Sequence, residues 1–448
     1  MSRLSVVDEI FLRTHRGMGT PIVLQGLWRT ADRVPPELLE RVHAALRTGP
    51  LGRRVVRARV PGARPYWRAN SSAHPLRLAQ RPLPAEHVLA WADNQGFDLD
   101  PEFGPGWRLA ATELADGGSV VSLTCSHVLS DGRGLAIAVD RALSGLDATT
   151  TRPGPAGRAR SSAGPESAGT APKSTGTTAP HAEALELGIA QSDWADARRQ
   201  WSIVLGGAAK ALRHGIPERP ARASGRDGGT AGGTVVTASC AVLQIPAADW
   251  ELAATARGGA ANTLFLHLTA HMLWNSGFRD PTISASVPVD TRDEPRVNND
   301  MAMTEVTVTR ADTPATLREK CRAAYEHRMS SPGGLPEEIL QVLPARAAHA
   351  LSRGAGERDI LCSNIGTLPT VLSHLGPHRC LGVAARAIHP GLTAPLPRTR
   401  LSAYLSRLEH TYTLSLISLD PDHIESPTAL TKLARSVLDR LDLPATAW

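Results

Sequence analysis

Alternating and amphipathic hydrophobic patterns along the chain predict strands mixed with helices. Residues 107–113 and 119–126 read as two strands, because apolar side chains dominate both and Asp116-Gly117-Gly118 between them favours a tight turn. Residues 35–46 carry apolar side chains at helical spacing, behind two prolines that favour a helix start. Further elements are predicted in the same way: strands at 21–30, 234–245, 282–289 and 304–309, strands near Ile360 and Leu414, and helices at 135–143, 262–274, 314–329 and 427–441. This mixture is typical of an α/β protein.

One further helix is predicted near the middle of the chain. Ser192 and Asp193 form a helix start signal, and the residues that follow place a set of large apolar side chains on one helical face: Trp194, Ala197, Trp201 and Leu205. The first and second halves of the chain are both predicted to mix strands and helices, so both are expected to be of the α/β class.

A segment poor in large apolar residues divides the chain. Residues 147–184 contain no Val, Leu, Ile, Met or aromatic residue and are rich in Pro, Gly, Ser, Thr and Ala. Such a composition cannot bury enough surface to offset the entropy lost on ordering. We therefore expect an N-terminal lobe at 1–146, a flexible linker at 147–184, and a crossover helix with a C-terminal lobe at 185–448.

Charge and targeting features narrow the class of protein. Lys plus Arg number 49 against 43 for Asp plus Glu, giving a net charge of +6, and the arginines are scattered rather than gathered in one block. This pattern favours an anionic ligand or an acidic partner over nucleic acid. No apolar run approaches the roughly 18 residues of a membrane span, and no signal peptide is evident, so a cytoplasmic protein is expected.

The cysteines point to neither a disulfide framework nor a metal site. The five are odd in number, widely spaced and without a CxxC pair: Cys125, Cys240, Cys321, Cys362 and Cys380. Reduced thiols are the expected state. His267 and His271 lie four apart on a predicted helix, but no glutamate and no third ligand accompany them, so no metal site is predicted.

His127 is the candidate catalytic residue. It stands where a predicted strand ends and a helix begins, and an imidazole at such an edge is suited to act as a general base. Asp131 can hold the turn by capping the helix or by pairing with a distant arginine, and Gly132 allows backbone geometry that a Cβ would hinder. Taken by itself, the segment also fits a solvated turn with an incidental histidine.

Several short motifs, in order along most of the chain, resemble the chloramphenicol acetyltransferase-like superfamily. His127, Asp131 and Gly132 match its HxxxDG motif; this superfamily includes nonribosomal peptide condensation domains, wax-ester synthases and polyketide-associated acyltransferases. Residues 97–99 with 106–109, and 201–206, are similar to stretches of condensation domains. The opening residues 4–12 and the segment 287–292 are similar to wax-ester synthases.

The resemblance implies two lobes of this type, each a mixed sheet with helices, with a tunnel between them and His127 at its middle. It implies that His127 deprotonates a hydroxyl or amine, which attacks an acyl thioester directly. No cofactor would be bound permanently; the co-substrate would be acyl-coenzyme A or a phosphopantetheine-linked acyl group on a carrier protein. Asp131 would be structural, with Arg292 as its partner.

A second stretch, Ser363, Asn364 and Gly366, resembles a segment near the tunnel of several relatives. A hydroxyl or amide there could donate to the developing oxyanion, whereas the alternative is a plain turn that ends a strand. Asn298, Asn299 and Asp300 are expected to form a plain loop. Arg53 and its basic neighbours are expected on a solvated face, with contact to coenzyme A phosphates as the alternative.

Two other functions stay open. Many members of the superfamily carry two adjacent histidines, whereas Ser126 precedes His127, so a non-catalytic platform that binds a carrier protein or partner enzyme is one alternative. A wax-ester or diacylglycerol synthase is the other, drawn from the first twelve residues. The leading hypothesis is an acyltransferase of specialised metabolism that forms an ester or amide on a small acceptor.

Overall fold

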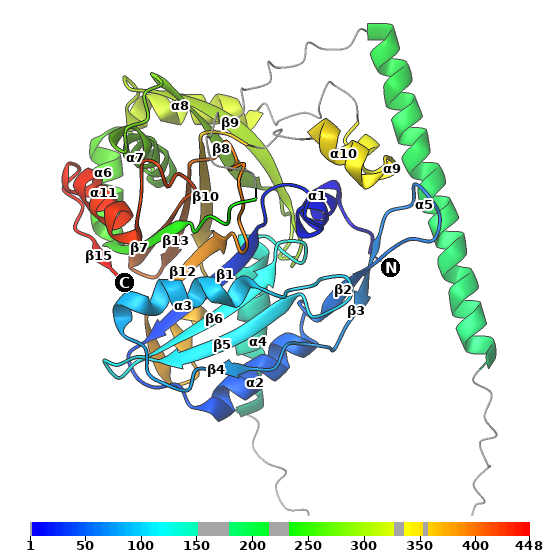
Figure 1. Ribbon diagram of the computed structural model, residues 1–448, viewed down its shortest axis with the longest axis horizontal. Coiled ribbons are helices and arrows are strands. Elements are labelled where there is room, and N and C mark those ends of the chain that lie inside the picture. The colour runs from blue at the N-terminus through cyan, green and yellow to red at the C-terminus, as the bar shows by residue number, and fades with distance from the viewer. Residues whose placement is uncertain (1, 151–178, 215–232, 327–335, 353–356) are drawn as a thin grey trace, which may run out of the picture.

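The computed structural model describes residues 2–150, 179–214, 233–326, 336–352 and 357–448. Two sheets form the centres of two lobes that lie against each other (Figure 1). Each lobe is a mixed sheet with helices, as predicted from the sequence. Within the described ranges, no helix combines the length and the apolar character needed to cross a membrane.

The first sheet has six strands in the order β11-β12-β1-β6-β5-β4. Its edge strand β4 pairs parallel with β5, whereas the other pairs are antiparallel. The strands β11 and β12 come from the C-terminal half of the chain, so the N-terminal lobe is completed by residues distant in sequence. The bounds are β1 Val23–Thr30, β4 Arg77–Leu78, β5 Trp107–Glu113, β6 Ser119–Ser126, β11 His374–Leu375 and β12 His378–Ile388.

The second sheet has seven strands in the order β15-β7-β14-β13-β10-β8-β9. Its strand β10 pairs parallel with both β13 and β8, and β12 of the first sheet contacts β13 and β14, which joins the lobes. The bounds are β7 Ser239–Pro246, β8 Thr282–Asp290, β9 Met301–Thr309, β10 Ile360–Thr367, β13 Leu401–Leu408, β14 Thr411–Ser418 and β15 Thr446–Ala447. A separate hairpin pairs β2 (Arg53–Val56) with β3 (Tyr66–Ala69).

Helices cover both sheets, with α2 and α4 packed together on the first lobe and α6, α7, α8 and α11 around the second (Figure 1). The buried helix α7 carries ten buried residues, among them Leu264, Phe265 and Leu268, and supplies much of the second core. The helix bounds are α1 Val6–His15, α2 Pro36–Thr48, α3 Val88–Asp93, α4 Gly132–Thr150, α5 Ala179–His214, α6 Ala247–Ala256, α7 Ala261–Asn275, α8 Pro314–Glu326, α9 Ile339–Val342, α10 Ala345–Ser352 and α11 Pro427–Asp439. Short 3-10 turns occupy Ala85–His87, Asn94–Gly96 and Thr370–Ser373.

The long helix α5 stands at one side of the molecule, beside the β2–β3 hairpin (Figure 1). The helix was predicted, and of the apolar residues expected on one of its faces Ala197 is buried, whereas Trp194 is 59% exposed and Leu205 is 64% exposed. The side that faces the protein instead carries Asp193 and Asp196, which accept hydrogen bonds from the backbone N–H groups of the hairpin connection at 2.9 Å. Polar contacts thus attach this helix together with apolar ones, since Ala197 and Val204 are buried and the Trp201 ring lies against Gly62 of the hairpin connection.

The division at 1–146, 147–184 and 185–448 stays a prediction. The helix α4 continues to Thr150 and α5 begins at Ala179, so both enter the predicted linker. Residues 151–178 of that linker lie outside the described part of the chain.

Candidate functional site

His127 follows directly after β6, five residues before α4 begins, and is 7% exposed. The imidazole stacks on the ring of Phe11 from α1, with ring centroids 3.6 Å apart and planes 15° apart. Burial lowers the pKa of His127 to about 4, although hydrogen bonds, including the one to Asn299, oppose this shift. The ring is therefore neutral at pH 7 and able to accept a proton.

Asn299 fixes which nitrogen of His127 carries the proton. The Asn299 Nδ2 group donates to Asp8 Oδ1 at 2.8 Å and to the carbonyl oxygens of His127 and Val128 at 2.8 and 3.2 Å. The carbonyl oxygens can only accept, so the amide oxygen must be the atom that faces His127 Nδ1 at 3.1 Å. Nδ1 is then the donor, and Nε2 is left unprotonated.

Asp8 supports this arrangement from the first turn of α1. Its carboxylate accepts from the backbone N–H of Ser5 at 2.9 Å, and the Ser5 hydroxyl accepts from the backbone N–H of Asp8 at 3.1 Å. This reciprocal capping box explains why the helix begins where it does. Burial raises the pKa of Asp8, against the hydrogen bond from Asn299. The opening segment of the chain is thus part of the site.

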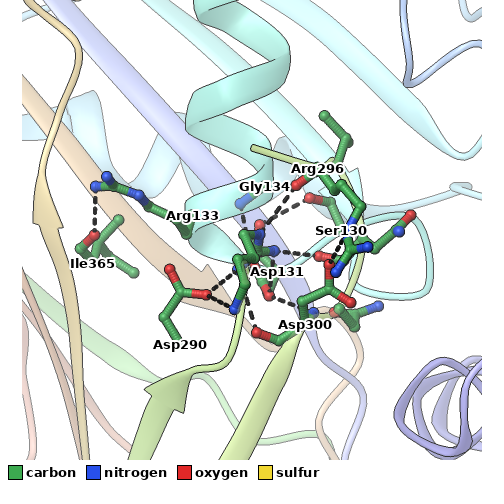
Figure 2. Close-up of polar contacts among 12 residues, drawn as sticks. Ser130, Asp131, Arg133, Gly134, Asp290, Arg296, Asp300 and Ile365 are labelled. Carbon is green, nitrogen blue, oxygen red and sulfur yellow. Dashed lines mark hydrogen bonds and ion pairs between the residues drawn. The ribbon is translucent and has the colours of Figure 1, made fainter. Parts of the chain in front are cut away.

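Asp131 and Arg292 form a buried ion pair between the lobes. Arg292 Nη2 lies 2.7 Å from both carboxylate oxygens of Asp131, and the two side chains are 5% and 7% exposed. Figure 2 shows that the carboxylate also accepts from the backbone N–H groups of Gly134 and Asp300, at 2.8 and 3.1 Å. The predicted partners therefore meet, and the carboxylate links the start of α4 to the β8–β9 connection.

Gly132 lies where the two lobes approach each other closely. A Cβ on this residue would stand 2.6 Å from Cδ1 of Ile365 on β10, a distance that would force one of them to move. The neighbouring Arg133 donates to the carbonyl oxygen of Ile365 (Figure 2) and to that of Thr367 on the same strand. The glycine is required by this packing between α4 and β10 and not by a positive φ.

Arg53 has a role that differs from both sequence readings. It is not on a solvated face: it donates to Asn298 Oδ1 at 2.9 Å, to Leu129 O at 2.6 Å and to the carbonyl of Val297, and it stacks over Trp67. Arg53 thus ties the HxxxDG turn to the loop that holds Asn299. That loop was expected to be plain, and nothing local in the sequence distinguishes it.

A cavity of about 510 Å³ lies between the lobes, and His127 forms part of its wall. Most of the lining is apolar and comes from both lobes, including Val6, Ile10, Leu24, Met301, Met303 and Leu361. Asp131, Gly132 and Arg292 also line it. The two lobes thus enclose a cavity where the resemblance implies a tunnel, and the histidine of the motif lies in its wall.

The stretch on β10 is placed partly as expected. Ser363 and Asn364 line the same cavity as His127. Gly366 has a φ of 82°, and its backbone N–H donates to Asn364 Oδ1 at 2.9 Å; it lies at an irregularity in the pairing of β10 with β13, which continues through Thr367. Asn364 Nδ2 donates to Asn262 at 3.3 Å.

The cysteines have the properties of inert thiols. Burial raises the pKa of four of them to about 12 and also raises that of Cys321: the four are Cys125, Cys240, Cys362 and Cys380. The rings of His267 and His271 lie with their centroids 4.2 Å apart and their planes tilted by 50°. Over the described ranges, no three His, Cys, Asp or Glu side chains are grouped so as to hold a metal ion.

Comparison with known proteins identifies the fold. No protein-family model and no curated protein matches the chain. Among solved structures, the first condensation domain of the CDA synthetase is similar, with a TM-score of 0.59 and 16% identity over 98% of this chain and 95% of that one. The EpoB cyclization-docking bidomain from Sorangium cellulosum has a TM-score of 0.56 and 13% identity, over 98% and 84% of the two chains.

A third similar structure is the starter condensation domain of rhizomide synthetase in complex with C8-CoA and Leu-SNAC. Its TM-score is 0.55 at 14% identity, over 98% of this chain and 93% of that one. All three matches extend over nearly the whole chain, so they include both lobes and the junction between them. The chain therefore has the same two-lobed fold as these solved domains.

Proposed function

We propose that this protein is an acyltransferase that moves an acyl group from a thioester to a hydroxyl or amine, with His127 as general base. The observation that carries the proposal is the state of His127: a neutral, buried imidazole in the wall of an interlobe cavity, with Nδ1 held as donor by Asn299. A base needs a free nitrogen that is unprotonated at working pH. Nε2 meets both requirements.

In the proposed reaction, Nε2 accepts the proton of the acceptor O–H or N–H as that atom attacks the thioester carbonyl carbon. The new C–O or C–N bond forms, and the carbonyl π electrons move onto the oxygen. When the tetrahedral intermediate collapses, the C–S bond breaks and the thiolate leaves with that electron pair. The imidazolium returns its proton to the thiolate, so His127 ends the cycle neutral.

Direct attack is favoured over an acyl-enzyme. The thiols described above are protonated at neutral pH, and the sequence has no GxSxG elbow that would present a serine nucleophile. Ser363 lines the cavity on the opposite lobe from His127, and we assign its hydroxyl as the candidate donor to the oxyanion. Asp131 and Arg292 hold the turn in place and take no proton.

The apolar lining suits an acyl chain more than a charged metabolite. The donor would be acyl-coenzyme A or a phosphopantetheine-linked acyl group on a carrier protein. The rhizomide starter domain, crystallised with C8-CoA and an aminoacyl thioester analogue, supports this class of donor. The acceptor would be a small molecule of specialised metabolism.

The test is thiol release from a series of acyl-coenzyme A donors, from acetyl to palmitoyl, with and without pooled alcohols and amines. Acyl transfer predicts release that requires an acceptor, together with a product whose mass is the sum of acyl group and acceptor. Intact-mass spectrometry should find no acylated protein during turnover. Binding of acyl carrier protein without release from any donor would instead favour the non-catalytic platform, and a strong preference for palmitoyl donors with long-chain alcohols would favour a lipid synthase.

A further inference from the structure

Large apolar side chains are exposed along one side of the helix α5. Trp194, Trp201 and Leu205 are 59%, 44% and 64% exposed, and Arg198, also exposed, lies between the two tryptophans. Trp201 is the least exposed of the three apolar residues because its ring lies against Gly62. We call these four exposed residues of α5 the outer stripe. A contiguous exposed apolar surface of this kind marks an interaction site.

The outer stripe repeats the spacing with which α5 packs on its own protein. Buried residues of the helix recur at i, i+4, i+7 and i+11: Asp193, Ala197, Gln200 and Val204. The outer stripe has the same spacing, one residue later. A helix that packs along its length on a neighbouring element presents side chains at this spacing. The helix therefore has two adjacent packing stripes, of which the protein covers the first and leaves the second largely exposed.

A second helix can approach the outer stripe closely. The exposed residues that border the stripe are small: Ala195, Ser202, Gly206 and Ala209. A Cβ on Gly206 would meet nothing within 4 Å. The helix runs along the outer edge of the molecule (Figure 1), and its stretch 192–209 is about 27 Å long, or about five turns. The outer stripe is therefore accessible to a helix of similar length.

The outer stripe carries a positive charge without a carboxylate. Asp193 and Asp196 face the protein, where they pair with Arg3 and Arg64 at 2.6 and 2.7 Å. None of the exposed residues in 192–209 is acidic. Within the described ranges, Arg198 donates to the carbonyl oxygen of Trp194 at 3.4 Å and has no carboxylate within ion-pair distance. An aromatic ring supplied from outside the helix would be a favourable partner for this guanidinium.

The order of residues in the outer stripe is complementary to itself when two copies run antiparallel. With a twofold axis midway between positions 194 and 205, Trp194 of one copy meets Leu205 of the other, and Arg198 meets Trp201. Each of these pairs occurs twice, and no pair joins two charges. In a parallel arrangement Arg198 would meet Arg198, which is repulsive. The antiparallel arrangement therefore gives apolar pairs at both ends and a cation–π pair on each side of the axis.

We infer that α5 is a dimerisation surface, through which two copies of this chain associate antiparallel about a twofold axis. The inference is independent of the proposed acyl transfer. A second copy covers the outer stripe of both molecules at once, so the dimer is closed. An acidic helix of another protein would pair with Arg198, but the other three residues of the stripe are apolar and are better matched by Trp and Leu side chains.

Sedimentation equilibrium tests the dimer directly. From about 1 to 100 μM the full chain should show a reversible monomer–dimer equilibrium. Trp194→Ala should raise the dissociation constant by about 30-fold and Leu205→Ala by about tenfold, since each dimer loses two contacts. Leu252→Ala is the matched control: Leu252 lies on α6, is 70% exposed and should leave the equilibrium unchanged. Circular dichroism should find all three variants folded, because the replaced side chains are exposed.

Cysteine cross-linking tests the register. A mixture of Trp194→Cys and Leu205→Cys proteins, oxidised with glutathione disulfide, should give a mixed disulfide-linked dimer, which keeps one Trp194–Leu205 contact. Either protein alone should give far less, because its two cysteines would lie about 16 Å apart along the helices. The native thiols have raised pKa values and should react slowly. A mixture of Trp194→Cys and Leu252→Cys is the matched control and should give no mixed dimer.

Three results would overturn the inference. The first is a protein that stays monomeric up to about 100 μM, which would leave the outer stripe to another partner, such as an acidic helix. The second is a dimer that Trp194→Ala and Leu205→Ala weaken no more than Leu252→Ala does. The third is efficient cross-linking of Trp194→Cys to itself, which would indicate parallel helices. Loss of acyl transfer in any variant has no bearing on these measurements, which need no substrate.

Discussion

The amide oxygen of Asn299 accepts a hydrogen bond from Nδ1 of His127 at 3.1 Å, although 172 residues separate the two along the chain. The amide is itself oriented by Asp8 and by two backbone carbonyls. This contact joins the HxxxDG turn of one lobe to the β8–β9 connection of the other. The hydrogen bond therefore fixes the tautomer of the buried His127.

Asn299→Ala should lower kcat by about 10- to 100-fold, since the Nδ1 proton would lose its fixed acceptor and a buried donor would be left unpaired. The loss should appear in kcat more than in KM, because Asn299 acts through His127. Asn298→Ala provides a matched control: its side chain accepts from Arg53 rather than from His127. An Asn299→Ala enzyme with unchanged kcat would show that the tautomer needs no such support.

The acidic limb of the pH profile of kcat/KM should lie near pH 4. The pKa of His127 is lowered to about 4 by burial, so the base is unprotonated, and active, from that pH upward, and activity is lost as the pH falls through it. Circular dichroism at each pH would establish that the protein stays folded. An acidic limb near pH 6.5, the ordinary pKa of histidine, would contradict the burial of the base in the free enzyme.

Arg292→Met should destabilise the protein by about 3–5 kcal/mol, because it leaves the Asp131 carboxylate buried and unpaired. Urea unfolding monitored by fluorescence would measure the change. Arg33→Ala is the matched control: its pair with Glu113 is exposed, with side chains 61% and 47% accessible, and should contribute about 0–1 kcal/mol. Equal effects of both substitutions would show that the Asp131–Arg292 pair is not important for stability.

Gly132→Ala should lower stability by about 1–3 kcal/mol through the clash with Ile365, and should lower turnover because α4 and β10 both border the site. Ile365→Val removes the Cδ1 atom in contact, so the double variant should recover most of the loss. Gly145→Ala, later in α4 where a Cβ would meet nothing within 4 Å, should be neutral or stabilising. A Gly132→Ala loss that Ile365→Val does not relieve would point to another cause.

Local patterns in the sequence were sufficient for many elements of the fold. The pair β5 and β6 occupies the residues predicted from alternation and the Asp116-Gly117-Gly118 turn, because a hairpin depends on neighbours in sequence. The pairing of β12 with β1 could not be predicted, because the paired residues lie 350 or more positions apart and no local signal specifies the pairing.

The site residues divide in the same way, into those that a local motif indicates and those that only long-range contacts bring together. The HxxxDG motif indicated His127 and Asp131, the family resemblance indicated Arg292, and the structure brings all three to one cavity. Asn299 and Arg53 were missed because their roles come only from contacts across the interlobe junction. The helix α5 was predicted with Trp194 and Leu205 on one apolar face, but helical spacing alone does not reveal that the protein covers the side with Asp193 and Asp196 and leaves those two side chains exposed.

The most direct test of the central claim compares thiol release by wild-type protein and by His127→Ala, with an acyl-coenzyme A donor and acceptor that the wild type uses. Loss of the base should lower turnover by about two to four orders of magnitude. His127→Gln, which retains a polar side chain next to Phe11, should fold like the wild type and lose activity as well. His271→Ala, a histidine of α7 that does not line the cavity, should retain full turnover. Unchanged, acceptor-dependent release by folded His127→Ala protein would contradict the assignment of this imidazole as the base.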